Sequence, residues 1–407
     1  MVMQRTRTVT KLPAGALFGP DGMPLVRGSR VDGAHLVDDP RDPVGIGYDR
    51  QIHAGLAALT QEVDVLDYAS AGQDSVNLSR DRVITALMLV ADPYQHDVTT
   101  AAITAVEDAV DKVISALSIA GKLTYLNLSS TDLFLKGISL QNKAVYGSSL
   151  PHQDLATAVA ADNLSRQAWF IPLGAMNDFD PFDITAGIPA EDEVSLILSA
   201  TFGANNIIAA VAANGTVDPA TNIYVVTYGV QGLSKTYRNR LPVPDFRFDH
   251  ITSPSSTTTF NLQTGRYLKR TTLVNLAVLA TNNQPRNDSN LDNLSMRFKR
   301  PTDTFLLNRV RWHLTKALFS PYASRMPDVN RDGAAAIITE PFVGGLVIDW
   351  RRLTKNPYGL NLYPFQEGDV QLSVELNDTT GTVHLYNEYY SMPDPSVGED
   401  WPPFRGQ

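Results

Sequence analysis

Apolar and polar residues alternate along much of the chain, with the period of two that is typical of β-strands. The alternation is cleanest near the C-terminal end, where single polar residues separate Val370, Leu372, Val374 and Leu376. A short Asp-Thr-Thr-Gly segment follows, and the alternation resumes over residues 382–390. Two such segments around a glycine-containing turn predict an antiparallel hairpin with one buried face.

Similar segments occur earlier in the chain in the same order, which predicts a tandem duplication. The alternating residues 191–201 align without gaps on residues 367–377, so that Val194, Leu196, Leu198 and Ala200 are expected to point inward. Three more pairs match in order along the chain: 82–91 with 270–280, 131–140 with 302–311, and 222–230 with 382–390.

Each copy has the length and the number of short strands of one jelly roll. The predicted fold class is therefore all-β, with two tandem eight-stranded jelly-roll β-sandwiches and a few short helices in the arm and loops. Glycine and proline interrupt the segments before, between and after the two copies. The predicted division is an N-terminal arm at 1–80, a first jelly roll at 81–232, a linker at 233–265, a second jelly roll at 266–392 and a tail at 393–407.

Three segments have apolar residues near helical spacing and predict short helices. They are residues 48–63, residues 99–117 and residues 154–164. The later part of the second segment, residues 111–121, fits a strand equally well.

The composition is that of a folded protein, with 43% hydrophobic and 19% charged residues among 407. No apolar run approaches the ~18 residues that a membrane-spanning helix requires. The first residues lack the apolar core of a secretion signal. There is no cysteine, which excludes disulfides and thiolate metal sites.

The net charge of −9 is unevenly distributed. Residues 12–230 hold 26 acids and 11 bases, whereas residues 231–355 hold 9 acids and 19 bases. Such a division predicts either a nucleic-acid surface or oppositely charged parts that face each other within or between subunits. We favour the second interpretation.

Basic residues gather in the second copy, where they are candidates for assembly contacts. They are expected to pair with the acidic first copy across a subunit boundary, although lipid headgroups or nucleic acid would attract them as well. The candidates are Arg309, Arg311, Arg351 and Arg352.

Catalytic and metal-binding patterns are sparse. Asp328, Asn330 and Asp332 match the first half of a calcium loop, but the acid expected at the twelfth position is one residue late, which favours an Asx-rich turn. The histidines lack zinc-site spacing, and neither a nucleophile elbow nor a phosphate-binding loop is present. We therefore expect no enzyme activity, no cofactor and no specific nucleic-acid binding.

Two fused sandwiches behind a short basic arm resemble the double jelly-roll major capsid proteins of tailless, membrane-containing bacteriophages such as tectiviruses and corticoviruses, whose relatives include the adenovirus hexon. The resemblance covers about residues 81–392 and rests mainly on architecture. Its nearest approach to a motif is the closing pair of strands, "DVQLSVEL" and "TVHLYNEYY". The chain departs from the smallest members in its leader of about 80 residues and in insertions within the first copy.

The resemblance implies a structural protein of the virion that is synthesised in the host cytoplasm. Three chains would form a pseudo-hexameric capsomer of an icosahedral shell, around an internal membrane and beside penton or minor capsid proteins. The resemblance also implies that Arg5, Arg7 and Lys11 of the arm face that membrane, and the aromatic residues Trp401 and Phe404 are expected to dock the tail on a neighbour.

Two other classes of function remain open from the sequence. One is a carbohydrate-binding or adhesive β-sandwich protein of a surface or spike. The other is a β-sandwich hydrolase with a carboxylate pair, because acidic pairs are plentiful in the predicted loops.

Overall fold

The computed structural model describes most of the chain between residues 58 and 392. The described ranges are 58–98, 114–129, 159–178, 180–203, 215–217, 221–233, 235–252, 257–276, 291–319, 329–330, 337–338, 345–376 and 382–392.

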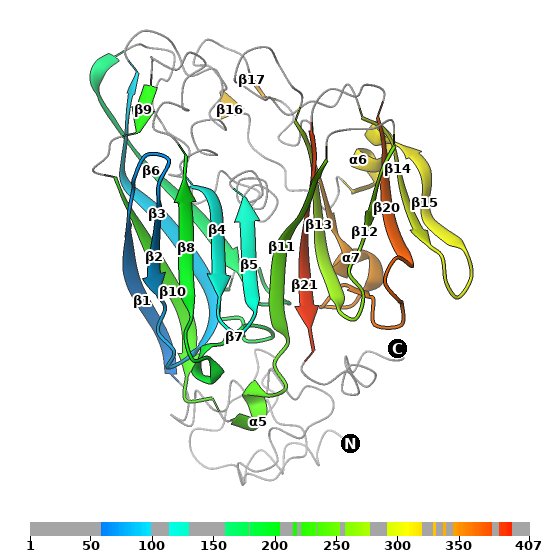
Figure 1. Ribbon diagram of the computed structural model, residues 1–407, viewed down its shortest axis with the longest axis horizontal. Helices are drawn as coiled ribbons and strands as arrows, with labels where there is room; N and C mark the ends of the chain where they lie inside the picture. The colour runs from blue at the N-terminus through cyan, green and yellow to red at the C-terminus, as the bar shows by residue number, and fades with distance from the viewer. Residues whose placement is uncertain are drawn as a thin grey trace, which may run out of the picture.

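The first half of the chain forms a β-sandwich of two sheets (Figure 1). One sheet contains, in spatial order, β1 (Ala58–Asp67), β10 (Asn222–Gln231), β3 (Val83–Val98) and β6 (Val159–Pro172). The opposing strands are β2 (Gln73–Asn77), β8 (Ile197–Phe202), β4 (Ile114–Ala120) and β5 (Thr124–Ser129). The short strands β7 (Ile188–Pro189) and β9 (Gly215–Val217) both pair with β3.

The second half forms another sandwich. Its first set of strands is β11 (Val243–Thr252), β21 (Thr382–Ser391), β13 (Tyr267–Leu276) and β18 (Gly345–Asp349), with β19 (Leu360–Asn361) pairing with β13. The opposing sheet is β12 (Thr257–Asn261), β20 (Val370–Leu376), β14 (Leu291–Phe298) and β15 (Thr304–Arg311). A separate hairpin pairs β16 (Val329–Asn330) with β17 (Ile337–Ile338).

The eight principal strands have the same order in both sandwiches. When the eight strands of each half are numbered in chain order, one sheet contains the first, eighth, third and sixth strands. The other sheet contains the second, seventh, fourth and fifth strands. This arrangement is that of a jelly roll, so the predicted fold class is confirmed. Three of the four repeated sequence pairs occupy equivalent strands, namely β3 with β13, β8 with β20 and β10 with β21. Residues 131–140 of the fourth pair lie outside the described ranges.

The two sandwiches share one continuous sheet. Strand β11 pairs antiparallel with β21 and, on its other side, pairs parallel with β5 through Phe246–Leu126 and Arg247–Asn127. This join produces a nine-stranded sheet that spans both halves, with β18 at one end and β2 at the other. The two sandwiches are therefore fixed side by side by backbone hydrogen bonds.

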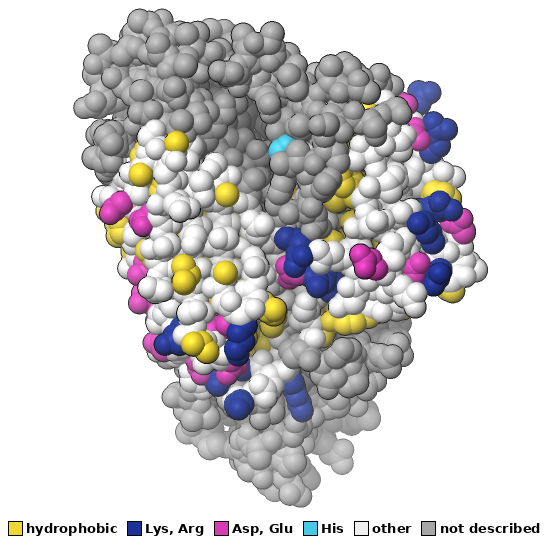
Figure 2. All heavy atoms as spheres, viewed as in Figure 1, with side chains coloured by type: hydrophobic (Ala, Val, Ile, Leu, Met, Phe, Trp, Pro, Cys, Tyr) yellow, Lys and Arg dark blue, Asp and Glu magenta, His cyan; other side chains and the backbone are white. Residues whose placement is uncertain are grey.

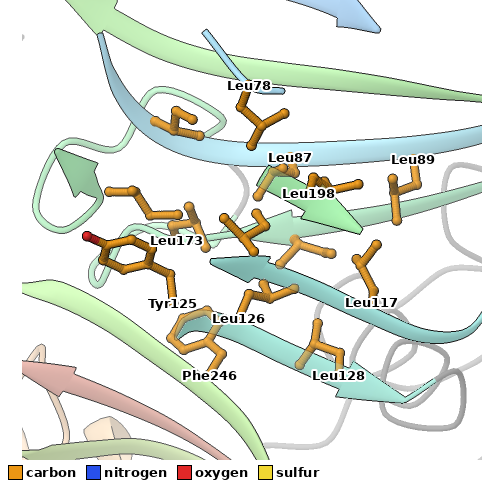
Figure 3. Close-up of a cluster of buried hydrophobic side chains, with 14 of the residues drawn as sticks. Leu78, Leu87, Leu89, Leu117, Tyr125, Leu126, Leu128, Leu173, Leu198 and Phe246 are labelled. Atoms are coloured by element: carbon orange, nitrogen blue, oxygen red, sulfur yellow. The ribbon is translucent and has the colours of Figure 1, made fainter. Parts of the chain in front are cut away.

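Each sandwich encloses its own apolar core. In the first, leucines such as Leu87, Leu117 and Leu198 point inward from facing strands, and Phe246 reaches the same cluster from β11 (Figure 3). The second core lies between the sheets of the second sandwich and includes Trp312 and Trp350. These tryptophans begin helices α6 (Trp312–Phe319) and α7 (Trp350–Thr354). Two shorter elements, η2 (Ala190–Asp192) and α5 (Lys235–Arg238), lie in the first half of the chain.

Strand β21 is buried on both faces. Val383, Leu385 and Tyr389 pack into the second core, whereas Tyr386 and Tyr390 join the first core. The predicted hairpin is wrong, because β20 and β21 lie in opposing sheets and do not pair with each other. In a jelly roll the seventh and eighth strands belong to different sheets, and the segment between them crosses the sandwich rather than reversing within one sheet.

Strands also occur where an arm and a linker were predicted. Strands β1 and β2 lie before residue 81 and pair with β10 and β8. Strands β11 and β12 lie within residues 233–265 and pair with β21 and β20. The missing strands are the first and second of each sandwich.

The described parts of two predicted helices are strands. Residues 58–63 belong to β1 and residues 159–164 belong to β6, because the neighbouring strands β10 and β3 satisfy their backbone groups. Of the ambiguous segment, residues 114–120 form β4. None of the helices within the described ranges has the length and apolar character needed to cross a membrane.

One predicted inward side chain is exposed. Val194 precedes the first residue of β8 and is 80% exposed, whereas Leu196, Leu198 and Ala200 are buried as predicted.

Replacement of Phe246 by alanine tests the join between the sandwiches. Phe246 is fully buried in the first core although it belongs to a strand of the second sandwich. We expect Phe246→Ala to lower the free energy of unfolding by about 3–5 kcal/mol, since a buried aromatic ring is lost and a cavity remains. Urea titration followed by tryptophan fluorescence measures the change. Leu123→Ala, at a side chain that is 61% exposed, is the control and is expected to leave the midpoint nearly unchanged.

Candidate assembly site

A cluster of buried ionisable side chains lies where the two sandwiches meet. It contains three carboxylates and three cations, and its formal charges sum to zero. The members of this buried charge cluster are Asp178, Asp349, Glu388, Lys269, Arg270 and Arg351.

Asp178 is the contribution of the first half of the chain and stands at the centre of the cluster. Its Oδ1 lies 2.8 Å from Lys269 Nζ and its Oδ2 lies 2.9 Å from Arg270 Nη2. Arg351 Nη2 also donates to Asp178 Oδ2. Each of these cations belongs to the second half, so the carboxylate ties the two sandwiches together.

The loop that carries Asp178 is held in place by a second carboxylate, Asp183. Asp183 Oδ2 accepts hydrogen bonds from the backbone N–H groups of Met176 at 2.9 Å and Asn177 at 2.7 Å. A Cβ at Gly174 would lie 2.5 Å from Asp183, so only glycine allows this close approach. The loop is thereby ordered immediately before Asp178.

Lys269 and Arg270 are consecutive in β13, yet both reach Asp178. The register between β13 and β21 shifts between Leu268 and Arg270, and such a bulge redirects one side chain of the strand. Gly359 packs against the bulge with φ of 95°, and a Cβ there would lie 2.1 Å from the Leu268 carbonyl oxygen. Glycine at 359 is therefore required for the bulge to form as it does.

Other polar atoms of the cluster have partners besides Asp178. Lys269 Nζ donates to the Gly174 carbonyl at 2.7 Å and to the Tyr390 hydroxyl at 3.1 Å. Asp178 Oδ1 forms an ion pair with Lys269 but has no hydrogen-bond partner among the described residues. Arg270 Nη1 lies 3.2 and 3.1 Å from the two carboxylate oxygens of Glu388. Asp349 caps α7 by accepting from the Arg351 backbone N–H at 3.1 Å.

The electrostatics of the cluster favour the charged forms of its carboxylates. Burial alone would raise the pKa of Asp178, but Lys269, Arg270 and Arg351 hold that pKa well below its usual value. Burial likewise opposes the ionisation of Asp349, and its bonds from Arg351 and the charge of Arg270 lower its pKa nevertheless. Burial lowers the pKa of Lys269, against the attraction of Asp178. Buried charges of this kind are tolerated only when each has its partner.

An aromatic group surrounds the cluster at the boundary between the sandwiches. Tyr390 contacts Phe246 and Tyr358 edge to face, with ring centroids 5.7 and 6.0 Å apart. The Tyr390 hydroxyl also lies 2.8 Å from the carbonyl oxygens of Leu173 and Gly174. The boundary is thus packed like a domain core rather than like a mobile hinge.

The structure places the predicted basic candidates in two different regions. Arg351 pairs with the acidic first half as expected, but this contact lies within one chain, and Arg352 lies 4.0 Å from Asp349. Arg309 and Arg311 lie on β15 at the far end of the second sandwich. Arg309 pairs with Glu375 at 2.9 Å, and its side chain is 68% exposed.

Most of the other candidates lie outside the described ranges. These are Arg5, Arg7, Lys11, Asp328, Asp332, Trp401 and Phe404. Asn330 lies on β16 opposite Ile337. Within the described residues, no group of three or more His, Asp or Glu side chains is arranged to hold a metal ion, and the calcium interpretation stays a prediction.

Sequence reasoning found Arg351 and missed the other five cluster residues, including Asp349. Lys269, Arg270 and Glu388 each interrupt a strongly apolar strand pattern, and a charge in such a pattern indicates either an exposed edge or a buried ion pair. Asp178 gives no comparable signal, because acids are common in loops.

The two ends of the molecule carry opposite charge. In Figure 2, acidic side chains mark the left edge of the described surface, and lysines and arginines stand among acidic side chains at the right-hand end. Residues 58–77, which include β1 and β2, contain four acids and no base. Residues 291–319, which include β14, β15 and α6, contain six bases and two acids.

No protein-family model matches the chain, and no curated protein matches its sequence. Solved structures match its fold. The major capsid protein of Sulfolobus Turreted Icosahedral Virus superimposes with a TM-score of 0.60 at 14% identity, covering 84% of this chain and 98% of that one. A second structure of that virus gives a TM-score of 0.57 at 15% identity, with 84% and 95% covered.

A third match is VP54 of PBCV-1, a structure that was fitted into a reconstruction of the virophage Sputnik. It has a TM-score of 0.51 at 12% identity and covers 82% of this chain and 93% of that one. The matched proteins are double jelly-roll capsid proteins, and the chain described here has the same double jelly-roll fold.

Removal of one charge from the buried charge cluster tests whether the cluster stabilises the folded chain. We expect Asp178→Asn to lower the free energy of unfolding by about 3–5 kcal/mol, because it leaves a surplus positive charge among buried cations. The measurement is a urea or guanidinium titration near neutral pH. The matched control is Asp303→Asn, which breaks an exposed pair with Arg297 and should leave stability almost unchanged. Equal behaviour of the two variants would contradict the role of the cluster.

His384 predicts an acid-sensitive contribution to stability. Burial on β21 lowers its pKa from 6.5 to about 4. Between these values the unfolded chain binds a proton that the folded chain does not, so stability falls as the pH drops from 6.5 towards 4, by up to about 3 kcal/mol. Below that window, the depressed pKa values of Asp178 and Asp349 add a further loss. We expect His384→Asn to flatten the upper part of this profile, whereas the same change at the exposed His313 should not.

Proposed function

We propose that this protein is a major capsid protein, a structural subunit of a viral shell rather than an enzyme. The observation that carries the proposal is the pair of jelly rolls with one strand order, fixed side by side in a single chain by a shared sheet and a buried charge cluster. The double jelly-roll structures that match it come from viral major capsid proteins, which supports a place in the virion.

The geometry gives a physical reason for the duplication. Three chains around an axis would present six sandwiches, and six similar sides tile a sheet with local hexagonal order. Such a ring uses heterologous contacts, in which one surface of a subunit meets a different surface of the next. We therefore propose a trimeric, pseudo-hexameric capsomer of an icosahedral shell.

The remaining partners follow from this proposal. The capsomers would contact one another and the penton or minor capsid proteins of the shell. The basic residues Arg5, Arg7 and Lys11 would face an internal membrane, where each contributes about 1 kcal/mol of attraction to anionic lipid. Trp401 and Phe404 would dock the tail on a neighbour. We assign no cofactor and no specific nucleic-acid contact.

The mass of the purified protein in solution tests the proposal. We expect light scattering after size exclusion to give three times the 44.5 kDa of one chain, and negative-stain images to show hexagonal particles or shells. The alternative, a carbohydrate-binding surface or spike protein, predicts instead that the protein is retained on a glycan array. A chain that stays monomeric at all concentrations, and forms no shell, would contradict the capsid function.

A further inference from the structure

Lys269 and Asp178 are held in close contact inside the buried charge cluster. Lys269 Nζ lies 2.8 Å from Asp178 Oδ1. That oxygen nevertheless accepts no hydrogen bond from a described residue, so the contact is an ion pair without the geometry of a hydrogen bond. A primary amine and a carboxyl group, which can condense to an amide, are therefore in contact through one carboxyl oxygen.

The hydrogen bonds of Lys269 determine where its nitrogen can react. Nζ donates to the Gly174 carbonyl at 2.7 Å and to the Tyr390 hydroxyl at 3.1 Å. The Tyr390 hydroxyl lies 2.8 Å from the carbonyl oxygens of Leu173 and Gly174 and donates its own proton there, so it accepts from the lysine. A neutral amine has two N–H groups, and these two acceptors use both. Its lone pair is then left to meet Asp178.

The surroundings of Lys269 favour the neutral amine that such a reaction needs. Its side chain is 0% exposed, and burial lowers its pKa. The rings of Phe246 and Tyr390 lie 6.0 and 5.5 Å from Nζ. A desolvated amine of this kind is an activated nucleophile. The site also excludes the water that would hydrolyse an amide once it had formed.

The other oxygen of Asp178 is held by two guanidinium groups. Oδ2 lies 2.9 Å from Arg270 Nη2 and 2.5 Å from Arg351 Nη2. Against the effect of burial, Lys269 and these two cations hold the pKa of Asp178 well below its usual value, so the resting carboxylate is charged. The same two arginines would stabilise the negative charge that gathers on Oδ2 when an amine adds to Cγ. Oδ1, which they do not hold, is then the oxygen that departs.

Glu388 places a further carboxylate beside the lysine. Its side chain is 0% exposed, and its Oε2 lies 3.9 Å from Lys269 Nζ. Both of its oxygens accept from Arg270 Nη1, at 3.2 and 3.1 Å. A carboxylate in this position can take a proton from the amine and return it to a leaving oxygen, and contacts of this kind are often long before the reaction and tighten during it.

We propose that Lys269 and Asp178 condense to an intramolecular amide bond that joins the two sandwiches covalently. The Nζ–Cγ bond forms and the Cγ–Oδ1 bond breaks. Two protons of the lysine ammonium leave with Oδ1 as one water molecule, and Glu388 carries a proton from the nitrogen to that oxygen. Nothing is oxidised or reduced, and Glu388 ends as the carboxylate that it was at the start. The ion pair described above is the reactant state.

The cluster accommodates the product as well as the reactants. Condensation removes one positive and one negative charge, and the four that remain still pair as Arg270 with Glu388 and Arg351 with Asp349. Oδ2 becomes the amide oxygen and keeps its two arginine donors. A chain without cysteine thereby gains a covalent link between distant segments, which restricts the unfolded chain as a disulfide would. The inference goes beyond the capsid function and does not depend on it.

The mass of the intact chain, measured after denaturation, tests the bond. We expect protein purified in its folded state to weigh less than its sequence by the mass of one water molecule. A protease digest then locates the loss, and a branched peptide that contains both Asp178 and Lys269 supports the proposal. A chain with its full sequence mass overturns it. A loss of water that maps elsewhere, for example to an Asp-Gly sequence, overturns it as well.

Two variants test the roles of the reacting groups. Lys269→Met removes the nucleophile and is expected to keep its full sequence mass. Glu388→Gln removes the proton carrier and is expected to form the bond at least about 100-fold more slowly, as is usual when a general acid–base residue is lost. The matched control is Glu193→Gln, at a buried glutamate that binds Tyr125 and Lys122 within the first sandwich. It should lose water as fast as the unaltered chain.

Chains sampled at intervals after cell-free synthesis give these rates, and thermal melting shows which variants are folded. The mass of the unaltered protein decides on the bond even where a variant at Lys269 or Glu388 fails to fold. A folded Glu388→Gln chain that forms the bond as fast as the Glu193→Gln chain would overturn the role of Glu388. Trimers built from chains of full sequence mass would overturn the bond and leave the capsid function standing. Monomers that contain the bond would do the reverse.

Discussion

The arrangement of this molecule depends on a cluster of six charged side chains that lie among one another where the two sandwiches meet. A charge removed from water is stable only when an opposite charge and hydrogen bonds replace the lost hydration. Asp178 meets Lys269, Arg270 and Arg351 only when the loop after β6 lies against β13 and α7. A displacement between the sandwiches would break several ion pairs at once. The cluster therefore favours one relative position of the two sandwiches.

The same position is specified by two other features. The parallel pairing of β5 with β11 makes the two sandwiches parts of one sheet, and the aromatic rings around Tyr390 fill the space beside it. Backbone pairing sets the register between the two sandwiches, and packing of the aromatic rings sets their separation. The buried charges disfavour other relative positions of the sandwiches. Under the proposed capsid function, a shell would need such fixed spacing, because small errors in the angle between sandwiches would accumulate from subunit to subunit. That need would give a reason for retaining polar groups in a boundary that apolar residues alone would stabilise.

The strands that sequence reasoning missed are the first two of each sandwich. Strand β2 (Gln73–Asn77) and strand β12 (Thr257–Asn261) are short, polar and at the edges of their sheets, and edge strands carry little of the apolar pattern that identifies a strand. Strand β11 contains Pro244 and charged residues, which resemble a linker. Residues 159–164 are rich in alanine and have a helical pattern, but their position beside β3 makes them part of a strand. The alternating segments β20 and β21 led to the prediction of a hairpin because local sequence does not record which sheet a strand joins.

The sequence by itself determined that the chain is a duplicated all-β protein, since apolar alternation and repeated order are properties of neighbouring residues. Its charge distribution also favoured contact between an acidic part and a basic part over a nucleic-acid surface. The tertiary structure decided where they meet, because Asp178 and Lys269 are far apart in the chain and only the fold brings them within 2.8 Å. It likewise decided that Arg351 is used within the chain while Arg311 remains exposed at the far end. Burial and ion pairing depend on contacts between distant segments, and a single sequence records those contacts only through the fold it adopts.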